Sequence, residues 1–304
     1  MDKFVISSTG LSMNYMPHYI AKELGYFRDV DLEVSSTVPI PWINVLKEID
    51  AGVAHVVEGG IWVPLIYLDR VRSYPSFAKI ASRCPLVIVS REPVDQFDWK
   101  MLENKKLLIA GGDGASHGLF VLGCAREAGV DLNKVSLVNN FMAATLVDLF
   151  CGGFGDMIVL PVELAAQLVA EKKGHVFADL TVRGGEVPWS VYYGTTEFLD
   201  HPGNLAGRFT LALQRATTWL QGHDARDCED IIRRNWPKVE FEKAVGVINM
   251  FKREGMWTPS VEIEEPILAR WQGFLVAAGL LDAPKPYQKV VDSRPYQYAK
   301  EKLK

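Results

Sequence analysis

Short apolar runs rich in β-branched residues alternate with longer runs of helical period along the first two thirds of the chain. Strands that alternate with helices form βαβ units, so this pattern predicts an α/β protein with largely parallel sheets. In the first part of the chain, the pattern predicts strands at residues 4–8, 32–38, 54–57, 77–80 and 85–90, and helices at residues 17–24, 42–51 and 61–68.

A second α/β set follows further along the chain. The pattern there predicts strands at residues 106–110, 135–138, 156–160 and 175–179, and helices at residues 116–128, 143–150 and 163–171. A strand at 189–193 is expected to return to the first set. Beyond it the chain is mostly helical, with helices predicted at residues 208–220, 228–235, 241–251 and 266–278.

The apolar pattern is interrupted at Arg91-Glu92-Pro93, and again just before the returning strand. These breaks predict a discontinuous lobe I, made of residues 1–90 and 187–304, and an inserted lobe II of residues 91–186. Two chain crossings between two α/β lobes make a hinge, and the cleft between such lobes is where small ligands bind. The organisation therefore predicts capture of a small-molecule ligand by closure.

Composition narrows the class of protein. The chain has 304 residues, 48% of them hydrophobic, and a formal net charge of -4. An apolar fraction of this size can fill a core, which excludes a disordered chain, a collagen-like repeat and a coiled coil. The slight negative charge and the lack of a basic stripe argue against a nucleic-acid partner. No uncharged apolar run is long enough to predict a membrane span.

Four cysteines, Cys84, Cys124, Cys151 and Cys228, lie far apart without a CxxC pair. This spacing indicates neither a metal site nor a redox motif, and no cofactor is expected. Cys124 and Cys151 are expected to be buried free thiols. The chain enters a strand-like run directly after Met1, without the apolar segment of a secretory signal. A cytoplasmic location is expected if Met1 is the native start, and a periplasmic or lipid-anchored one if a signal was trimmed.

Open α/β sheets bind ligands beyond the carboxyl ends of their strands, where loops lead into helix N-termini. This rule selects four loops and a few flanking residues as the candidate ligand site. The candidates are Ser12, Asn14, Tyr15, His18, Glu58, Gly59, Gly60, Trp62, Arg83, Gly114, Ala115, Ser116, His117, Asn140, Phe141, Pro161, Trp189 and Tyr192.

Several candidates have a purely structural alternative. Ser116 is as well explained as a helix N-cap, and Trp62, Trp189 and Tyr192 as core aromatics. The glycine-rich loop at 111–115 lacks the signatures of a nucleotide P-loop and of a dinucleotide site, so it predicts no phosphate binding.

Four segments resemble type II periplasmic-binding proteins, in the branch that binds aliphatic sulfonates, taurine, nitrate and thiamine pyrimidines. They follow the family's order and together cover nearly the whole chain. The segments are residues 17–34, 109–131, 143–161 and 279–299. The resemblance implies a two-lobed fold with a hinged cleft, and a substrate-binding protein that would deliver its ligand to an ABC permease if it is exported.

One departure from the family bears on the ligand. The chain carries Glu58 where the family often has a small-residue turn after an Asp. A carboxylate there would repel a sulfonate or nitrate unless a cation faced it. An ester, an amide, an aromatic heterocycle or a cationic ligand therefore becomes a better candidate than a simple anion. The function hypothesis as a whole is that the two lobes close on a small planar or carboxylated organic ligand.

A cytoplasmic enzyme of the same fold is the alternative function. Glu58 with His18 or His117 would supply its general acid and base, as in a lyase or decarboxylase. Two enzyme classes of this fold come into question, an aromatic desulfinase and a pyrimidine-precursor synthase. The chain lacks the synthase's Cys-rich motif, and Leu11-Ser12-Met13 replaces the loop that carries the desulfinase's cysteine.

Overall fold

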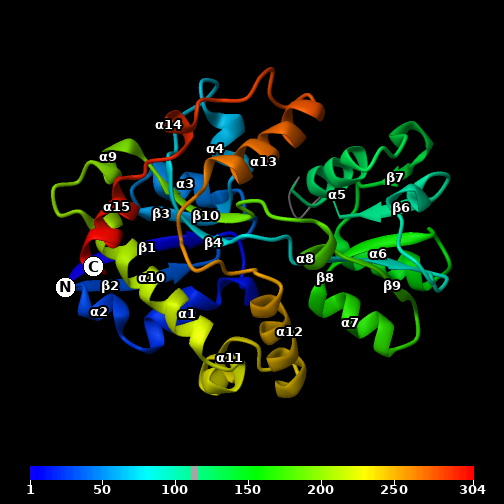
Figure 1. Ribbon diagram of the computed structural model, residues 1–304, viewed down its shortest axis with the longest axis horizontal. Coiled ribbons are helices and arrows are strands. Elements are labelled where there is room, and N and C mark those ends of the chain that lie inside the picture. The colour runs from blue at the N-terminus through cyan, green and yellow to red at the C-terminus, as the bar shows by residue number, and fades with distance from the viewer. Residues whose placement is uncertain (111–115) are drawn as a thin grey trace. The chain divides into compact units, whose positions relative to one another are not determined.

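A computed structural model describes residues 1–110 and 116–304 (Figure 1). These residues form two compact units. Unit 1 contains Met1–Ser82, Val187–Gln272 and Ala283–Lys304, and unit 2 contains Arg83–Glu186 and Gly273–Asp282.

A five-stranded sheet of order β2-β1-β3-β10-β4 forms the centre of unit 1. Strand β1 is parallel to β2 and β3, whereas β10 is antiparallel to its neighbours β3 and β4. The sheet therefore joins strands from both ends of the unit 2 insertion. Its strands are β1 (Asp2–Ser8), β2 (Leu32–Thr37), β3 (Val56–Gly60), β4 (Ser76–Ala81) and β10 (Ser190–Gly194).

Helices pack against this sheet and enclose an aromatic core. In that core Phe209, which is fully buried, stacks on Phe4 at 4.5 Å and on Phe27 at 5.1 Å between ring centroids. The helices of unit 1 are η1 (Met13–Tyr15), α1 (Met16–Glu23), α2 (Tyr26–Asp29), α3 (Asn44–Asp50), α4 (Trp62–Tyr67), α9 (Thr196–Leu199), α10 (Leu205–Gly222), η4 (Ala225–Cys228), α11 (Glu229–Asn235), α12 (Phe241–Arg253), α14 (Tyr287–Val290) and α15 (Arg294–Lys302). Helix α13 (Glu265–Ala277) contains the boundary between the units after Gln272.

Unit 2 has its own five-stranded sheet, of order β7-β6-β8-β5-β9. Strand β6 is parallel to β7 and β8, and β5 is antiparallel to β8 and β9. Its strands are β5 (Leu86–Ser90), β6 (Lys106–Ile109), β7 (Ser136–Val138), β8 (Met157–Pro161) and β9 (His175–Asp179). Its helices are η2 (Trp99–Leu102), α5 (Ser116–Glu127), η3 (Leu132–Lys134), α6 (Ala143–Cys151), α7 (Val162–Ala170) and α8 (Leu180–Arg183).

The structure confirms the predicted α/β class and corrects three details. Strand β5 pairs in the sheet of unit 2, whereas the sequence pattern assigned it to lobe I. The third strand begins and ends later than predicted, so that it includes Glu58, Gly59 and Gly60. Cys151 is exposed at the end of α6, although Cys84, Cys124 and Cys228 are buried.

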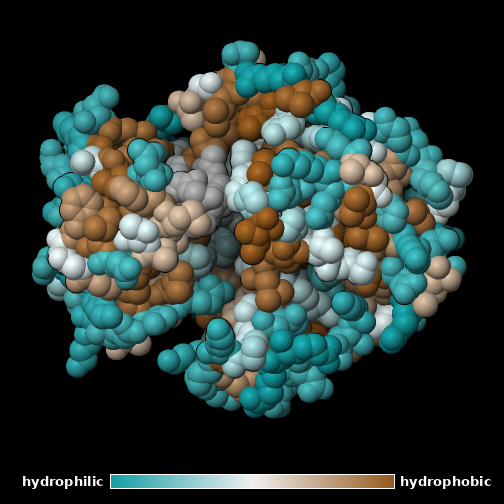
Figure 2. All heavy atoms as spheres, turned by 180° about the vertical axis from the view of Figure 1, so that it is seen from behind, coloured by the Kyte–Doolittle hydropathy of each residue, from teal (hydrophilic) through white to brown (hydrophobic). Residues whose placement is uncertain are grey.

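The surface of the described residues mixes polar and apolar side chains, as Figure 2 shows for one face. No helix in the described ranges is both long enough and apolar enough to cross a membrane. Exposed apolar side chains include several from loops that follow strands of either unit. In unit 1 these are Leu11, Val38, Ile40 and Ile43, and in unit 2 they are Phe141 and Met142.

Candidate functional site

Three strands of unit 1 bring their site residues to one edge of the sheet. Strands β1 and β3 are parallel, so the residues after Ser8 and Gly60 lie at the same edge. Strand β10 runs the other way and begins there, with Ser190 opposite Gly60. Helix η1 follows the first loop and α4 follows the second, which is the arrangement expected of a ligand site in an open α/β sheet.

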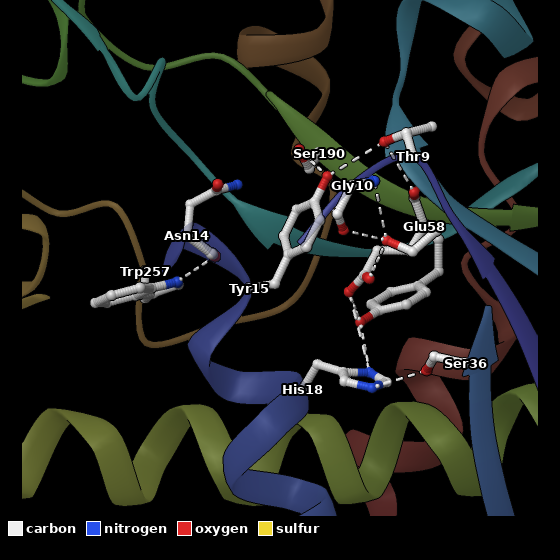
Figure 3. A network of polar contacts seen from close by, with 11 residues as sticks. Thr9, Gly10, Asn14, Tyr15, His18, Ser36, Glu58, Ser190 and Trp257 are labelled. Atoms are coloured by element: carbon white, nitrogen blue, oxygen red, sulfur yellow. Dashed lines mark hydrogen bonds and ion pairs between the residues drawn. The ribbon is translucent and has the colours of Figure 1, made fainter. Parts of the chain in front are cut away.

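Hydroxyl groups gather around Tyr15 at this edge (Figure 3). Ser190 Oγ donates to the Tyr15 hydroxyl at 3.4 Å, and Thr9 Oγ1 lies 3.5 Å from the same oxygen. Tyr15 is only 5% exposed. Burial, followed by the nearby Glu58, raises the pKa of the Tyr15 phenol to about 12, so it stays a hydrogen-bonding hydroxyl at neutral pH.

Ser12 immediately precedes η1, and Asn14 lies within it. The Asn14 backbone carbonyl accepts from the Trp257 indole at 2.8 Å, and the Ser12 hydroxyl donates to the Asn14 side chain. Asn14 is buried and Ser12 half-buried. Trp257, from the segment between α12 and α13, thus fixes the first loop from the C-terminal part of the chain.

Trp62 opens α4, separated from the glycine pair by Ile61 alone, and is half-buried. A Cβ on Gly60 would lie 2.5 Å from Trp62 Cδ1, so only glycine lets the indole lie against the strand. The Trp42 ring meets that of Trp62 edge-on at 5.6 Å. No hydrogen-bond partner of the Trp62 indole N–H occurs among the described residues.

Glu58 lies one layer deeper, within β3, and is 2% exposed. The Tyr192 hydroxyl, itself fully buried, donates to Glu58 Oε1 at 2.5 Å, and Ser8 Oγ lies 2.8 Å from Oε2. Burial raises the pKa of Glu58 to about 7, against the opposing effect of the contacts with Tyr192 and Ser8. This carboxyl group can therefore hold a proton at neutral pH.

His18, on α1, reaches the same cluster from below (Figure 3). Its Nδ1 lies 3.3 Å from the Tyr192 hydroxyl and 4.0 Å from Glu58 Oε1, and its Nε2 lies 3.2 Å from Ser36 Oγ. Burial, and to a smaller degree Lys22, lowers the pKa of His18 to about 3. The ring is therefore neutral at pH 7, and His18 and Glu58 do not form an ion pair.

Strand ends also converge in unit 2. Strands β6, β7 and β8 are mutually parallel, so the residues after Ile109 and Val138 lie at the edge where Pro161 ends β8. The half-buried Ser116 and His117 open α5 at this edge, and the exposed Asn140 and Phe141 follow β7.

Arg83, Gly114 and Ala115 complete the predicted set in unit 2. Arg83 Nη1 donates to the Thr181 carbonyl at 3.1 Å, which ties β5's leading segment to α8. Gly114 and Ala115 lie outside the described residues. No group of three or more His, Cys, Asp or Glu side chains in the described ranges is placed to hold a metal ion.

The structure brings most of the unit 1 candidates to one edge of the sheet, where some are partly exposed and others are fully buried. Ser12, Trp62 and Trp189 are half-buried, whereas Glu58 and Tyr192 lie beneath them. Glycines are depleted in strands, so the segment after Val57 resembled a loop. Pairing with β10 turns it into a strand and buries Glu58 between two neighbouring strands.

Sequence reasoning missed Thr9, Ser36, Trp42, Ser190 and Trp257. Each contacts a partner that is distant in the sequence, and for four of the five the local pattern carried no signal. Trp42 alone had a usable signal, because a tryptophan at the start of a predicted helix is a common ring-binding residue.

Two α/β units, each built on a five-stranded sheet and linked by more than one chain crossing, define the fold of type II periplasmic-binding proteins. The periplasmic aliphatic sulphonate binding protein SsuA of Escherichia coli is similar in structure, with a TM-score of 0.71 and 12% identity over 96% of this chain and 92% of SsuA. The desulfurization enzyme DSZB, in a complex with biphenyl-2-sulfinic acid, also has a TM-score of 0.71, with 14% identity over 99% of both chains.

Sequence comparison places the chain in a family. The model of the NMT1/THI5-like family matches residues 12–226, and the chain belongs to that family. A relative from Bacillus subtilis (strain 168), named "Putative binding protein YtlA", is 24% identical over 96% of this chain and 88% of its own length. These results confirm the resemblance inferred from the sequence segments.

Proposed function

We propose that this protein is the substrate-binding component of an ABC importer and that it binds a small planar organic ligand. The proposal is supported by the relative named as a binding protein and by the fold that the chain shares with a sulphonate-binding protein. Delivery of the ligand to a permease follows from this class of function. The fold alone does not decide it, because DSZB, an enzyme, has the same fold.

The observation that carries the proposal is the composition of the unit 1 edge. Trp62 offers a half-buried ring whose indole N–H has no hydrogen-bond partner among the described residues, and the Tyr15 hydroxyl comes from η1 at the same edge. Within the described part of the chain, the hydrogen bonds of Thr9, Tyr15 and Ser190 involve no Lys or Arg side chain. Aromatic and hydroxyl groups whose described hydrogen bonds include no cation favour an uncharged ring over a sulfonate or nitrate.

The enzyme alternative is less well supported by the geometry. Its predicted acid and base, Glu58 and His18, are each 2% exposed, so neither can touch a ligand in this arrangement. His117, the other predicted base, belongs to unit 2. The alternative predicts that a bound molecule is converted, whereas a binding protein releases it unchanged.

Native mass spectrometry of the purified protein, with identification of whatever is released on denaturation, tests the function. We expect one planar small molecule, returned unchanged after incubation with fresh protein. A chemically altered molecule would establish the enzyme alternative instead. A protein that retains no such molecule and binds none from a library of planar heterocycles would contradict the proposed function.

Trp62→Ala then tests the site by calorimetry with the identified molecule. Loss of a stacking ring and one donor should weaken binding by about tenfold to a hundredfold. Trp219→Ala is the matched control, because Trp219 is also half-buried in unit 1 but stacks on His223 near the end of α10. Wild-type affinity in Trp62→Ala would show that the ligand binds elsewhere.

A further inference from the structure

The Ser8 hydroxyl has two acceptors within reach but only one proton to give. Its Oγ lies 2.8 Å from the Gly10 carbonyl oxygen and 2.8 Å from Glu58 Oε2. A carbonyl oxygen cannot donate, so Ser8 must donate to Gly10 if that contact is a hydrogen bond. The contact between Ser8 and Glu58 then requires its proton to come from the carboxyl group.

The other groups of the cluster agree with this assignment. Tyr192 donates its single proton to Glu58 Oε1, so the Tyr192 oxygen is left to accept from His18 Nδ1. A neutral His18 that carries its proton on Nδ1 accepts at Nε2 from the exposed Ser36 hydroxyl. Every donor is used once. With this assignment the donors run in one direction through Ser36, His18, Tyr192, Glu58 and Ser8 to the Gly10 carbonyl.

The charges around Glu58 favour this neutral state. The titratable groups that face it are Tyr15 from η1, Tyr19 and His18 from α1, and Tyr192 from β10. Three are phenols and the fourth is a neutral ring, so among the described residues that face Glu58 no cation compensates a carboxylate. A buried carboxyl group without a cation is stabilised in its protonated form.

We propose that Glu58 is protonated in this structure and is a positioning residue that holds the loop after β1 through Ser8. When Glu58 loses its proton, the Ser8 hydroxyl turns to carboxylate oxygen Oε2, while Tyr192 continues to donate to Oε1. The Gly10 carbonyl then loses its hydrogen bond from Ser8, and the loop after β1 keeps only the weaker contact from the Gly10 N–H to Ser8 Oγ and the contacts of Thr9 with the Glu58 carbonyl. The effect of this change on a ligand rests on the proposed function, but the proton and the loop contact do not.

Carbon-13 NMR of the whole, ligand-free protein tests the inference. Glutamate labelled at the side-chain carboxyl reports the proton on Glu58, and labelled backbone carbonyl at Gly10 reports the loop. We expect one glutamate resonance, absent in Glu58→Gln, that titrates at clearly higher pH than those of exposed glutamates. The Gly10 resonance should move with the same midpoint.

Two variants separate positioning from a merely structural role. The amide of Glu58→Gln can donate to Ser8 and accept from Tyr192. The Gly10 carbonyl resonance should therefore keep its low-pH chemical shift throughout the titration. In Ser8→Ala, the Glu58 carboxyl resonance should still titrate, but the Gly10 carbonyl resonance should no longer shift with it. Ser7→Ala is the matched control, because the neighbouring Ser7 hydroxyl donates to Glu48 instead, and Gly10 should respond as in the wild type.

Two results would overturn the inference. One is a Glu58 carboxyl group that ionises together with the exposed glutamates. The other is a Gly10 carbonyl that does not change while Glu58 titrates in the wild type. Either result leaves the proposed function intact, because no ligand enters the experiment, and a failure to find a ligand leaves the proton and loop measurements unaffected.

Discussion

Glu58 and His18 show how one buried cluster can shift two side chains in opposite directions. Both are 2% exposed, and burial disfavours the charged form of each. The pKa of Glu58 therefore rises from 4.5 to about 7, and that of His18 falls from 6.5 to about 3. At neutral pH His18 is therefore uncharged, whereas Glu58 is close to its own pKa and holds its proton fully only in more acidic solution.

These two shifts predict a compensation in the stability of the protein. Between pH 4.5 and about 7, native Glu58 holds a proton that the unfolded chain has released, so its contribution falls as pH rises. Between about pH 3 and 6.5, native His18 lacks a proton that the unfolded chain binds, so its contribution grows as pH rises. The two effects oppose each other from pH 4.5 to 6.5.

In Glu58→Gln, of these two residues only His18 should contribute to the pH dependence of the free energy of unfolding. Relative to wild type, its free energy of unfolding should rise with pH between 4.5 and 6.5, with a difference in slope of up to about 1.4 kcal/mol per pH unit. Urea unfolding at a series of pH values measures this slope. Parallel curves for wild type and variant would show that native Glu58 is ionised in that window.

At the scale of elements, α10 stabilises unit 1 by placing Phe209 in the centre of the aromatic core. Phe209→Ala removes a fully buried ring that stacks on two others, and we expect it to cost about 3–5 kcal/mol of unfolding free energy. Phe141→Ala, at a side chain that is 46% exposed, should cost about 0.5 kcal/mol or less. Equal losses in urea unfolding would contradict the assignment of the core to Phe209.

The sequence predicted helices better than it predicted the site. The helix predicted at 241–251 is observed at Phe241–Arg253, because its apolar period of 3.6 is set locally. The third strand was misplaced because its end is decided by pairing with β10, more than a hundred residues later. Glu58 was recognised as a departure from the family, but its depth and its partners Ser8 and Tyr192 depend on that same pairing.

At the scale of the whole molecule, closure of two lobes on the ligand stays a prediction from the sequence. If it is correct, small-angle X-ray scattering should show a smaller radius of gyration when the ligand identified by mass spectrometry is added. Trp62→Ala should need more ligand for the same change. An unchanged radius at saturating ligand would exclude closure as part of binding.

The position of β10 in the first sheet has a consequence for how the protein is made. This strand lies between β3 and β4, yet it is encoded after nearly the whole of unit 2. While the ribosome is translating unit 2, the edges of β3 and β4 that β10 will join have no partner from this sheet. The nascent chain must therefore keep a half-built sheet from pairing wrongly until residue 194 has left the exit tunnel, whereas the strands of unit 2 emerge one after another and can assemble first.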